Sequence, residues 1–188
     1  MTDRSPARAP GRLREAFRAA AALAAVMAAA AVVLATLDAV PAWIVGDARD
    51  VRRARTVDEV ERRLRTRLVL PAYFPARLAW PPQRIRYVAG PPGAVSLWVD
   101  ARAGAPALLI AQTLGRGALP DRILPQAQEL DGSPVAVGPA QGRLSRVVED
   151  GEVRWQLAWE QGGRSLLLRS RGTVDELLRM ARSAREAP

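Results

Sequence analysis

The chain has 188 residues, a formal net charge of +9, and neither histidine nor cysteine. It also has no lysine, so all 28 basic residues are arginine. These absences exclude disulfides, thiolate metal sites, catalytic thiols, histidine-based triads, Schiff-base lysines and the phosphate-binding P-loop. We therefore expect a protein that is not an enzyme and carries no cofactor and no metal.

The positive charge does not by itself indicate a nucleic-acid partner. The arginines are spread along the chain among apolar and acidic neighbours, and only 5% of the residues are aromatic. A platform that stacks bases needs clustered aromatic side chains. The chain is also rich in Ala, Pro and Gly, as a compositional bias would produce, so we expect no nucleic acid among its partners.

Residues 19–37 form a run without charge or proline. About twenty apolar residues in a helix span the roughly 30 Å hydrocarbon layer of a bilayer. The run therefore predicts a transmembrane anchor, and Trp43 just beyond it suits the aromatic belt at the interface. The predicted lipid-facing residues are Ala19, Leu23, Val26, Met27, Val32, Val33, Leu34 and Leu37.

The same run is open to two other interpretations. A buried helix of a soluble bundle would carry a polar face, and residues 19–37 have none. A cleavable signal also has an Arg-rich start, an apolar run and small residues, here around residues 39–42, but its apolar part usually has only about 7–15 residues. The length favours an uncleaved anchor, and cleavage stays open.

The arginines near the run predict its orientation. Five arginines and two acidic residues precede it, whereas three arginines and three aspartates follow closely. The positive-inside rule then places a tail, residues 1–18, in the cytoplasm and the rest outside. The expected protein is a single-pass cell-membrane protein with an extracytoplasmic, periplasmic-type domain.

Residues 38–68 are expected to form a basic juxtamembrane stalk, helical from about Asp47 to Leu68. Thr56 and Glu59 fit a capping box, which offers a break near Arg55 and a second helix from Val57. The arginine-rich face suits either anionic headgroups or the solvated side of a helix packed on the domain, and the second is preferred. The apolar stripe consists of Val51, Ala54, Val57, Val60, Leu64 and Leu68.

Residues 69–188 are expected to fold as one extracytoplasmic domain. Proline makes residues 68–82 extended rather than helical or part of a central strand, with Tyr73, Phe74 and Trp80 in the core. Strands are predicted at residues 84–88, 94–100 and 107–113, and one short strand at residues 134–137.

The end of the chain carries the clearest local patterns. Asp150-Gly151 predicts a type I′ hairpin between residues 144–149 and 152–160, and Gly162-Gly163 leads to a third strand at residues 164–170. A helix capped by Thr173 and Glu176 follows, and its stripe must pack on the sheet. The predicted fold class is α+β: an N-terminal transmembrane helix, then a curved antiparallel sheet of about six strands packed with a C-terminal helix.

Several short motifs carry a family resemblance. They are LP-x-YFP at residues 70–75, LLIAQT at residues 108–113, LAW at residues 157–159, and TVDELLRMARS at residues 173–183. Over about residues 68–184 the chain resembles the uncharacterised extracytoplasmic domain of membrane-anchored, anti-sigma-factor-like proteins. More distantly it is similar to the half-barrel of periplasmic lipoprotein carriers and sigma-factor regulators. The resemblance implies a binding or sensing module without catalysis; the zinc-binding cytoplasmic module of such proteins needs His and Cys, which are absent.

Two groups of residues are candidates for function. Three acidic residues lie at the hairpin tip, namely Glu149, Asp150 and Glu152. They could form a loose calcium site, but the preferred interpretation is that they are solvated turn residues. Acidic residues at the starts of both helices are explained by the helix dipole. The second group consists of large apolar side chains that either line an apolar cleft or belong to the core, and the core is the preferred interpretation. Its members are Trp80, Tyr87, Trp98, Trp155, Trp159 and Leu177.

Two functions follow from these expectations. The first is a membrane-anchored interaction module that scaffolds or senses a protein partner beside the lipid bilayer. The alternative is a half-barrel carrier or sensor of a lipid or other apolar ligand, which needs a cavity of several hundred Å³ between sheet and helix. Close packing of Trp155, Trp159 and Leu177 would argue against the carrier.

Overall fold

A computed structural model of the chain describes Met27 and residues 51–186. Apart from Met27, the tail, the predicted anchor and Trp43 lie outside these residues. No helix within the described part has the length and hydropathy needed to cross a bilayer. The account below concerns residues 51–186, which belong to one compact unit.

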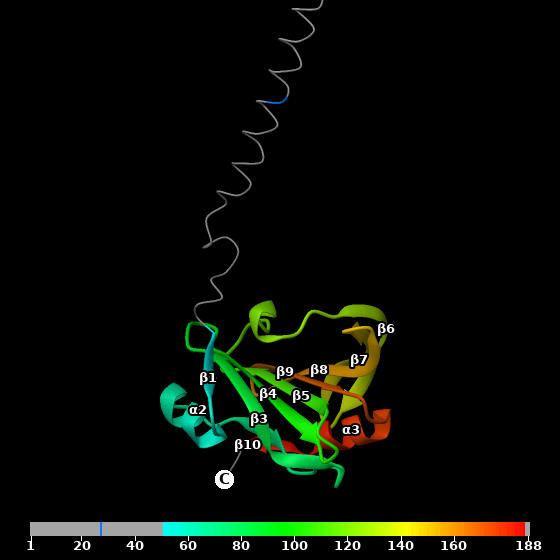
Figure 1. Cartoon of the computed structure of the whole chain (residues 1–188), viewed down its shortest axis with the longest axis horizontal. Coiled ribbons are helices and arrows are strands. Elements are labelled where there is room, and N and C mark those ends of the chain that lie inside the picture. The colour runs from blue at the N-terminus through cyan, green and yellow to red at the C-terminus, as the bar shows by residue number, and fades with distance from the viewer. Residues whose placement is uncertain (1–26, 28–50, 187–188) are drawn as a thin grey trace, which may run out of the picture. The chain divides into compact units, whose positions relative to one another are not determined.

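An eight-stranded antiparallel open sheet forms the body of this unit, and a two-stranded sheet and two short helices complete it (Figure 1). The order of the strands in the large sheet is β1-β3-β4-β5-β9-β8-β7-β6. The fold is mainly β. The expected antiparallel sheet with a C-terminal helix is confirmed, and the number of about six strands is too low.

The bounds of the elements are as follows. The large sheet contains β1 (Arg52–Ala54), β3 (Leu78–Val88), β4 (Ala94–Ala101), β5 (Pro106–Thr113), β6 (Gln128–Val137), β7 (Ala140–Glu149), β8 (Glu152–Gln161) and β9 (Arg164–Ser170). The small sheet pairs β2 (Val69–Pro71) with β10 (Ala184–Glu186), and the helices are α2 (Val57–Leu64), the 3₁₀ turn η2 (Asp121–Ile123) and α3 (Val174–Arg182).

One face of the large sheet, the helix face, is covered by α3. The register aligns a continuous row of aliphatic residues across six strands, namely Ile85, Leu97, Ile110, Leu168, Leu157 and Leu144. Leu177 and Met180 of α3 are fully buried in the same cluster as this row. Alternation along each strand therefore places the main core between sheet and helix.

The opposite face, the crossing face, is partly covered by residues 114–127. This segment runs over the sheet on the side away from α3 and contains η2 (Figure 1). Its Ile123 is fully buried against Val88 and Ala94, while Leu119 and Leu124 also pack on a cluster around Trp98 and Leu167. The central strands are thus buried on both faces.

The predicted turns and caps are confirmed. Asp150 and Gly151 have φ values of 52° and 77°, and Gly162 and Gly163 have 60° and 75°. Both pairs adopt the positive φ that type I′ turns require. Thr173 and Glu176 form the expected reciprocal capping box of α3.

The expected helix from Asp47 to Leu68 is wrong in the part that the structure describes. Residues 52–54 form strand β1, which pairs with β3, and α2 starts only at Val57. Thr56 is an extended N-cap whose hydroxyl accepts from the Glu59 amide, as the alternative break predicted. Val60 is fully buried in the main core, which agrees with a helix packed on the domain.

Three further expectations need correction. A strand is present at residues 134–137, but it is the end of the longer β6, an edge strand so exposed that it shows no apolar alternation. Trp80 was expected in the core but is 45% exposed and stacks on Phe74, with ring centroids 4.9 Å apart. Residues 68–82 were expected to lie outside any central strand, yet the proline pair at residues 81–82 lies within β3. The pairing of β3 with β4 shifts register there.

Gly142 of β7 lies where the neighbouring strand leaves no room for a side chain. A Cβ atom there would lie 2.9 Å from the Ala158 carbonyl oxygen and 3.2 Å from Cβ of Trp159, its cross-strand partner. We expect Gly142→Ala to lower the free energy of unfolding by about 1–3 kcal/mol through overpacking. Denaturant titration will measure the loss, and Gly90→Ala, where the new Cβ meets nothing within 4 Å, serves as the control. Equal stability of the two variants would contradict this account.

Glu176 makes stability depend on pH. The Arg77 guanidinium donates to its carboxylate, with Nη2 2.6 Å from Oε2, and with the Thr173 amide it holds the pKa of Glu176 below its ordinary 4.5. A depressed pKa stabilises the fold above 4.5, and this stability is lost as pH falls through the folded-state pKa. Glu176→Gln should therefore cost about 1 kcal/mol at pH 7, and the cost should shrink in acid. Thermal unfolding from pH 7 to 3 tests this, with Glu160→Gln, which removes an exposed carboxylate, as the matched control.

Candidate functional site

A network of buried polar side chains lies on the crossing face. Arg169 of β9 is 4% exposed, and its Nη1 donates to Oε2 of Glu149 at 2.5 Å. The same guanidinium also donates to Oε1 of Gln156, from Nε at 2.9 Å and Nη2 at 2.7 Å, and from Nη1 to the Pro125 carbonyl at 3.2 Å. Arg169 therefore links three strands of the sheet to the end of the crossing segment.

Arg154 of β8 also belongs to this network, but it lacks hydrogen-bond acceptors among residues 51–186. Its side chain is 7% exposed, and its Nη2 lies 3.6 Å from a carboxylate oxygen of Glu149 and 3.6 Å from one of Glu152. Both distances are longer than a hydrogen bond. Within the described residues, Nε of Arg154 is buried without any acceptor. We call Arg169, Glu149, Gln156 and Arg154 the arginine network.

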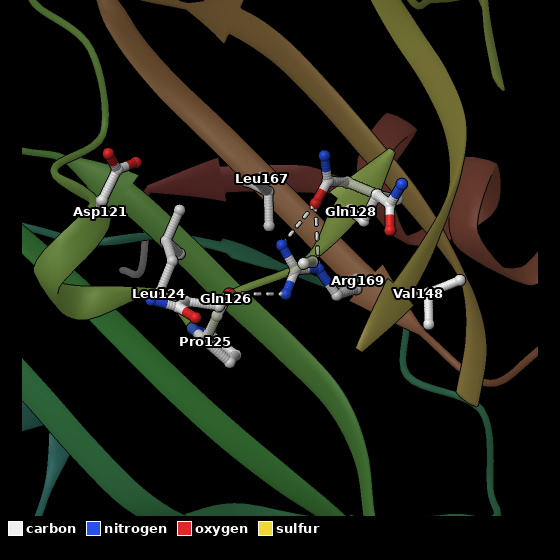
Figure 2. A pocket seen from close by; sticks show the side chains of 10 residues that line it. Asp121, Leu124, Pro125, Gln126, Gln128, Val148, Leu167 and Arg169 are labelled. Atoms are coloured by element: carbon white, nitrogen blue, oxygen red, sulfur yellow. Dashed lines mark hydrogen bonds between the residues drawn. The ribbon is translucent and has the colours of Figure 1, made fainter. Parts of the chain in front are cut away.

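Arg169 forms part of the floor of a large hollow of about 710 Å³ on the crossing face. Figure 2 shows its guanidinium hydrogen-bonded within the hollow, between Leu124 and Pro125 on one side and Val148 on the other. Leu167 and Val148 supply apolar wall, while Gln126, Gln128 and Gln156 supply amides. The hollow therefore combines apolar contact with hydrogen-bonding groups, which suits binding.

A second, smaller hollow of about 210 Å³ lies on the other side of Pro125. Its positive lining comes from Arg84 and Arg86 of β3 and Arg154 of β8. The remaining lining residues are Trp98, Pro106, Pro125, Glu149 and Asp150. Residues of β3, β4, β5 and β8 thus contribute to one hollow.

The space between α3 and the sheet is packed. Trp159 is 5% exposed and Leu177 fully buried in one cluster, and Trp155 packs against that cluster. This packing counts against the expected ligand cavity between helix and sheet. The large hollow lies instead on the opposite face, and its lining is partly polar.

The predicted aromatic group does not assemble into one cleft. Tyr87, Trp155 and Trp159 belong to the core on the helix face, whereas Trp98 lies in a separate cluster on the crossing face. Trp80 stacks on Phe74 beside a third depression near Arg185. Tyr87 is 1% exposed, and its hydroxyl accepts from Nη1 of Arg63 at 2.8 Å. Tyr87, Trp98, Trp159 and Leu177 are buried, and Trp98 also lines the small hollow.

The acidic hairpin tip is organised by arginines. Glu149 was expected to be a solvated turn residue, yet it is 6% exposed because Arg169 and Arg154 face its two oxygens. Glu152 pairs with Arg171. Within the described residues, no group of three or more acidic side chains is placed to hold a metal ion.

Sequence patterning missed the arginine network for a physical reason. Arg154 and Gln156 alternate with Val153, Trp155 and Leu157, and this alternation normally indicates a solvated face. The crossing segment covers that face, which alternation within one strand does not reveal. The available signal was Arg169 itself, a charged residue directly after three leucines in β9.

Arg169 should be the most costly arginine to remove. Arg169→Met leaves the buried Glu149 carboxylate with only the distant Arg154, and breaking a buried pair on one side costs about 3–5 kcal/mol. Arg143→Met is the matched control, because Arg143 is 57% exposed and its pair with Glu129 should contribute at most about 1 kcal/mol. Denaturant titration of both variants measures the difference, and similar losses would show that the network does not stabilise the fold.

Comparison with known proteins gave no assignment: no family model, no curated protein and no solved structure matches the chain.

Proposed function

We propose that this chain is a non-catalytic interaction module, anchored to the cell membrane by one helix, that scaffolds or senses a partner at the extracytoplasmic surface. The anchor is residues 19–37, with residues 1–18 in the cytoplasm. The bilayer is one partner and a protein is the other. The family resemblance to anti-sigma-factor-like proteins belongs to the same proposal.

The observation that carries the proposal is the large hollow on the crossing face. Its floor is rigid, because Arg169 is tied to Glu149, Gln156 and the Pro125 carbonyl. Its rim at residues 126–128 is exposed and offers two glutamine side chains. A rigid concave surface of mixed polarity costs little ordering entropy on binding, which favours a docking role.

The chemistry of the described side chains favours binding over catalysis. The chain has no His, Cys or Lys to act as base or nucleophile. The buried carboxylate of the network, Glu149, directs one oxygen to Arg169 and the other toward Arg154. A carboxylate held between two guanidinium groups is poorly placed to exchange a proton with a substrate.

The carrier of an apolar ligand remains the weaker alternative. It is supported by the volume of the large hollow on an open sheet. Against it stand the packing of Leu177 on the helix face and the arginine on the floor of the hollow. An apolar ligand would leave the outer amides of the hollow without partners.

The anchor is tested in cells that express the full chain. We expect the protein to stay with membranes in alkaline carbonate and the domain from residue 51 onward to be digested by protease added outside. Deletion of residues 19–37 should release the protein from the membrane. Recovery of the intact chain from the soluble cytosol, or protection of the domain from external protease, would overturn the proposed topology.

The docking surface is tested by filling the hollow. Ala127 is exposed and lines it, so Ala127→Trp should block a partner without disturbing the core. With a photoreactive amino acid at Gln128, we expect a discrete crosslinked protein in intact membranes that is lost in Ala127→Trp. Ala103→Trp, on the exposed turn between β4 and β5, is the matched control. Crosslinks that are absent, or unchanged by both substitutions, would overturn the contact.

A further inference from the structure

Three guanidinium groups converge on the small hollow. Arg84 and Arg86 point from the same face of β3, and Arg154 comes from β8. No carboxylate within residues 51–186 forms an ion pair with Arg84 or Arg86. Guanidinium forks that lack a protein partner are suited to bind oxyanions.

Trp98 holds the two arginines of β3 in place. The guanidinium carbons of Arg84 and Arg86 lie 5.6 and 5.2 Å from the centre of a ring of Trp98. Cation–π contact of this kind restrains a long side chain and leaves the N–H groups at its edge free to donate. Trp98 is itself 8% exposed, so its ring is a fixed platform.

Arg154 supplies the buried group whose partners are missing. Its side chain is nine-tenths buried, its nearest carboxylate oxygens are 3.6 Å away, and its Nε has no acceptor in the described part of the chain. A buried charged donor without a hydrogen bond is costly. An oxyanion in the small hollow would provide the acceptors that Glu149, already bound to Arg169, does not.

The lining of the small hollow carries a net positive charge. Its three arginines, Arg84, Arg86 and Arg154, accompany two carboxylates, Glu149 and Asp150. Because Arg169 from outside the lining pairs with Glu149, the positive charge of the lining is free to attract an anion. A phosphate monoester carries about −1.5 to −2 charges at pH 7 and presents three acceptor oxygens.

We propose that the small hollow, lined by Arg84, Arg86, Arg154 and Trp98, is a binding site for a phosphate group. The group belongs either to a small soluble phosphate compound or to a lipid headgroup, and the recognition chemistry is the same. The site shares only Pro125 with the large hollow, so it does not depend on the proposed docking of a partner there.

The test uses the full chain in nanodiscs of phosphatidylcholine, titrated with inorganic phosphate in a calorimeter at constant ionic strength. We expect one saturable site per chain. The double variant Arg84→Gln/Arg86→Gln should weaken phosphate binding by about tenfold for each arginine lost, and Arg154→Met by about tenfold. Arg84 and Arg86 are outside the core, so the double variant should keep the thermal transition of the original protein. Arg62→Gln, an exposed arginine of α2, should bind phosphate unchanged.

Three further results decide the proposal and the source of the phosphate. Absence of saturable binding, or equal affinity in the original protein and the double variant, overturns the site. Succinate, a dianion without phosphate geometry, should bind at least about tenfold more weakly, and equal binding overturns the assignment to phosphate. In nanodiscs that contain phosphatidic acid, loss of the free-phosphate signal in the original protein assigns the site to a headgroup, and an unchanged signal assigns it to a soluble compound.

Discussion

The aliphatic row that runs from Ile85 to Leu144 is the constraint on which the rest of the structure depends. A row that stays on one face across six strands requires every pairing to be in one register, because a slip of one residue would turn a whole strand over. This requirement fixes the opposite face as well. Arg154, Gln156 and Arg169 are directed away from α3 because their neighbours must face it.

The fixed register places arginines on the crossing face, where they line the proposed binding surface. Arginines that would be solvated on an open sheet lie under the crossing segment, where Ile123 and Leu124 hold that segment down. Arg169 is compensated by Glu149 and two further acceptors, and it contributes to rigidity. Among the residues that the structure describes, Arg154 has no acceptor for its Nε, and this uncompensated group lies in the small hollow beside Arg84 and Arg86. Structural and ligand-binding demands are therefore divided between two arginines of the same network.

Local chemistry made the C-terminal half of the fold predictable. Asp150-Gly151, Gly162-Gly163 and the Thr173–Glu176 cap each act within a few residues, so β8, β9 and α3 were predicted with nearly correct bounds, while β7 starts four residues before its expected start. Where tertiary contacts decide, the sequence was less informative. The stretch near Arg52 has helical periodicity but pairs with β3 as β1, and Thr56 then starts a shorter helix. β6 carries Gly132 and Pro134 and is exposed, so only its pairing with β7 defines it as a strand.

The candidate sites were the least predictable feature, again for a physical reason. The crossing segment contributes five lining residues to the large hollow and Pro125 to the small one, and its residues 114–127 have no regular pattern apart from η2. The tryptophans drew attention because of their size, yet the register distributes Trp98 and Trp159 to opposite faces. Single-strand alternation identifies which residues share a face, and it leaves open which face becomes covered.

The free edge of the large sheet at β6 has a consequence for crowding. Pro134 cannot donate a backbone hydrogen bond, and the ion pairs of Glu129 with Arg143 and of Asp131 with Arg146 place charges along the last two strands. Such edges resist strand-to-strand association between copies. Under the proposed membrane anchoring, copies of the chain would be confined to two dimensions and would meet often, and an edge that does not pair with a second copy would keep them separate.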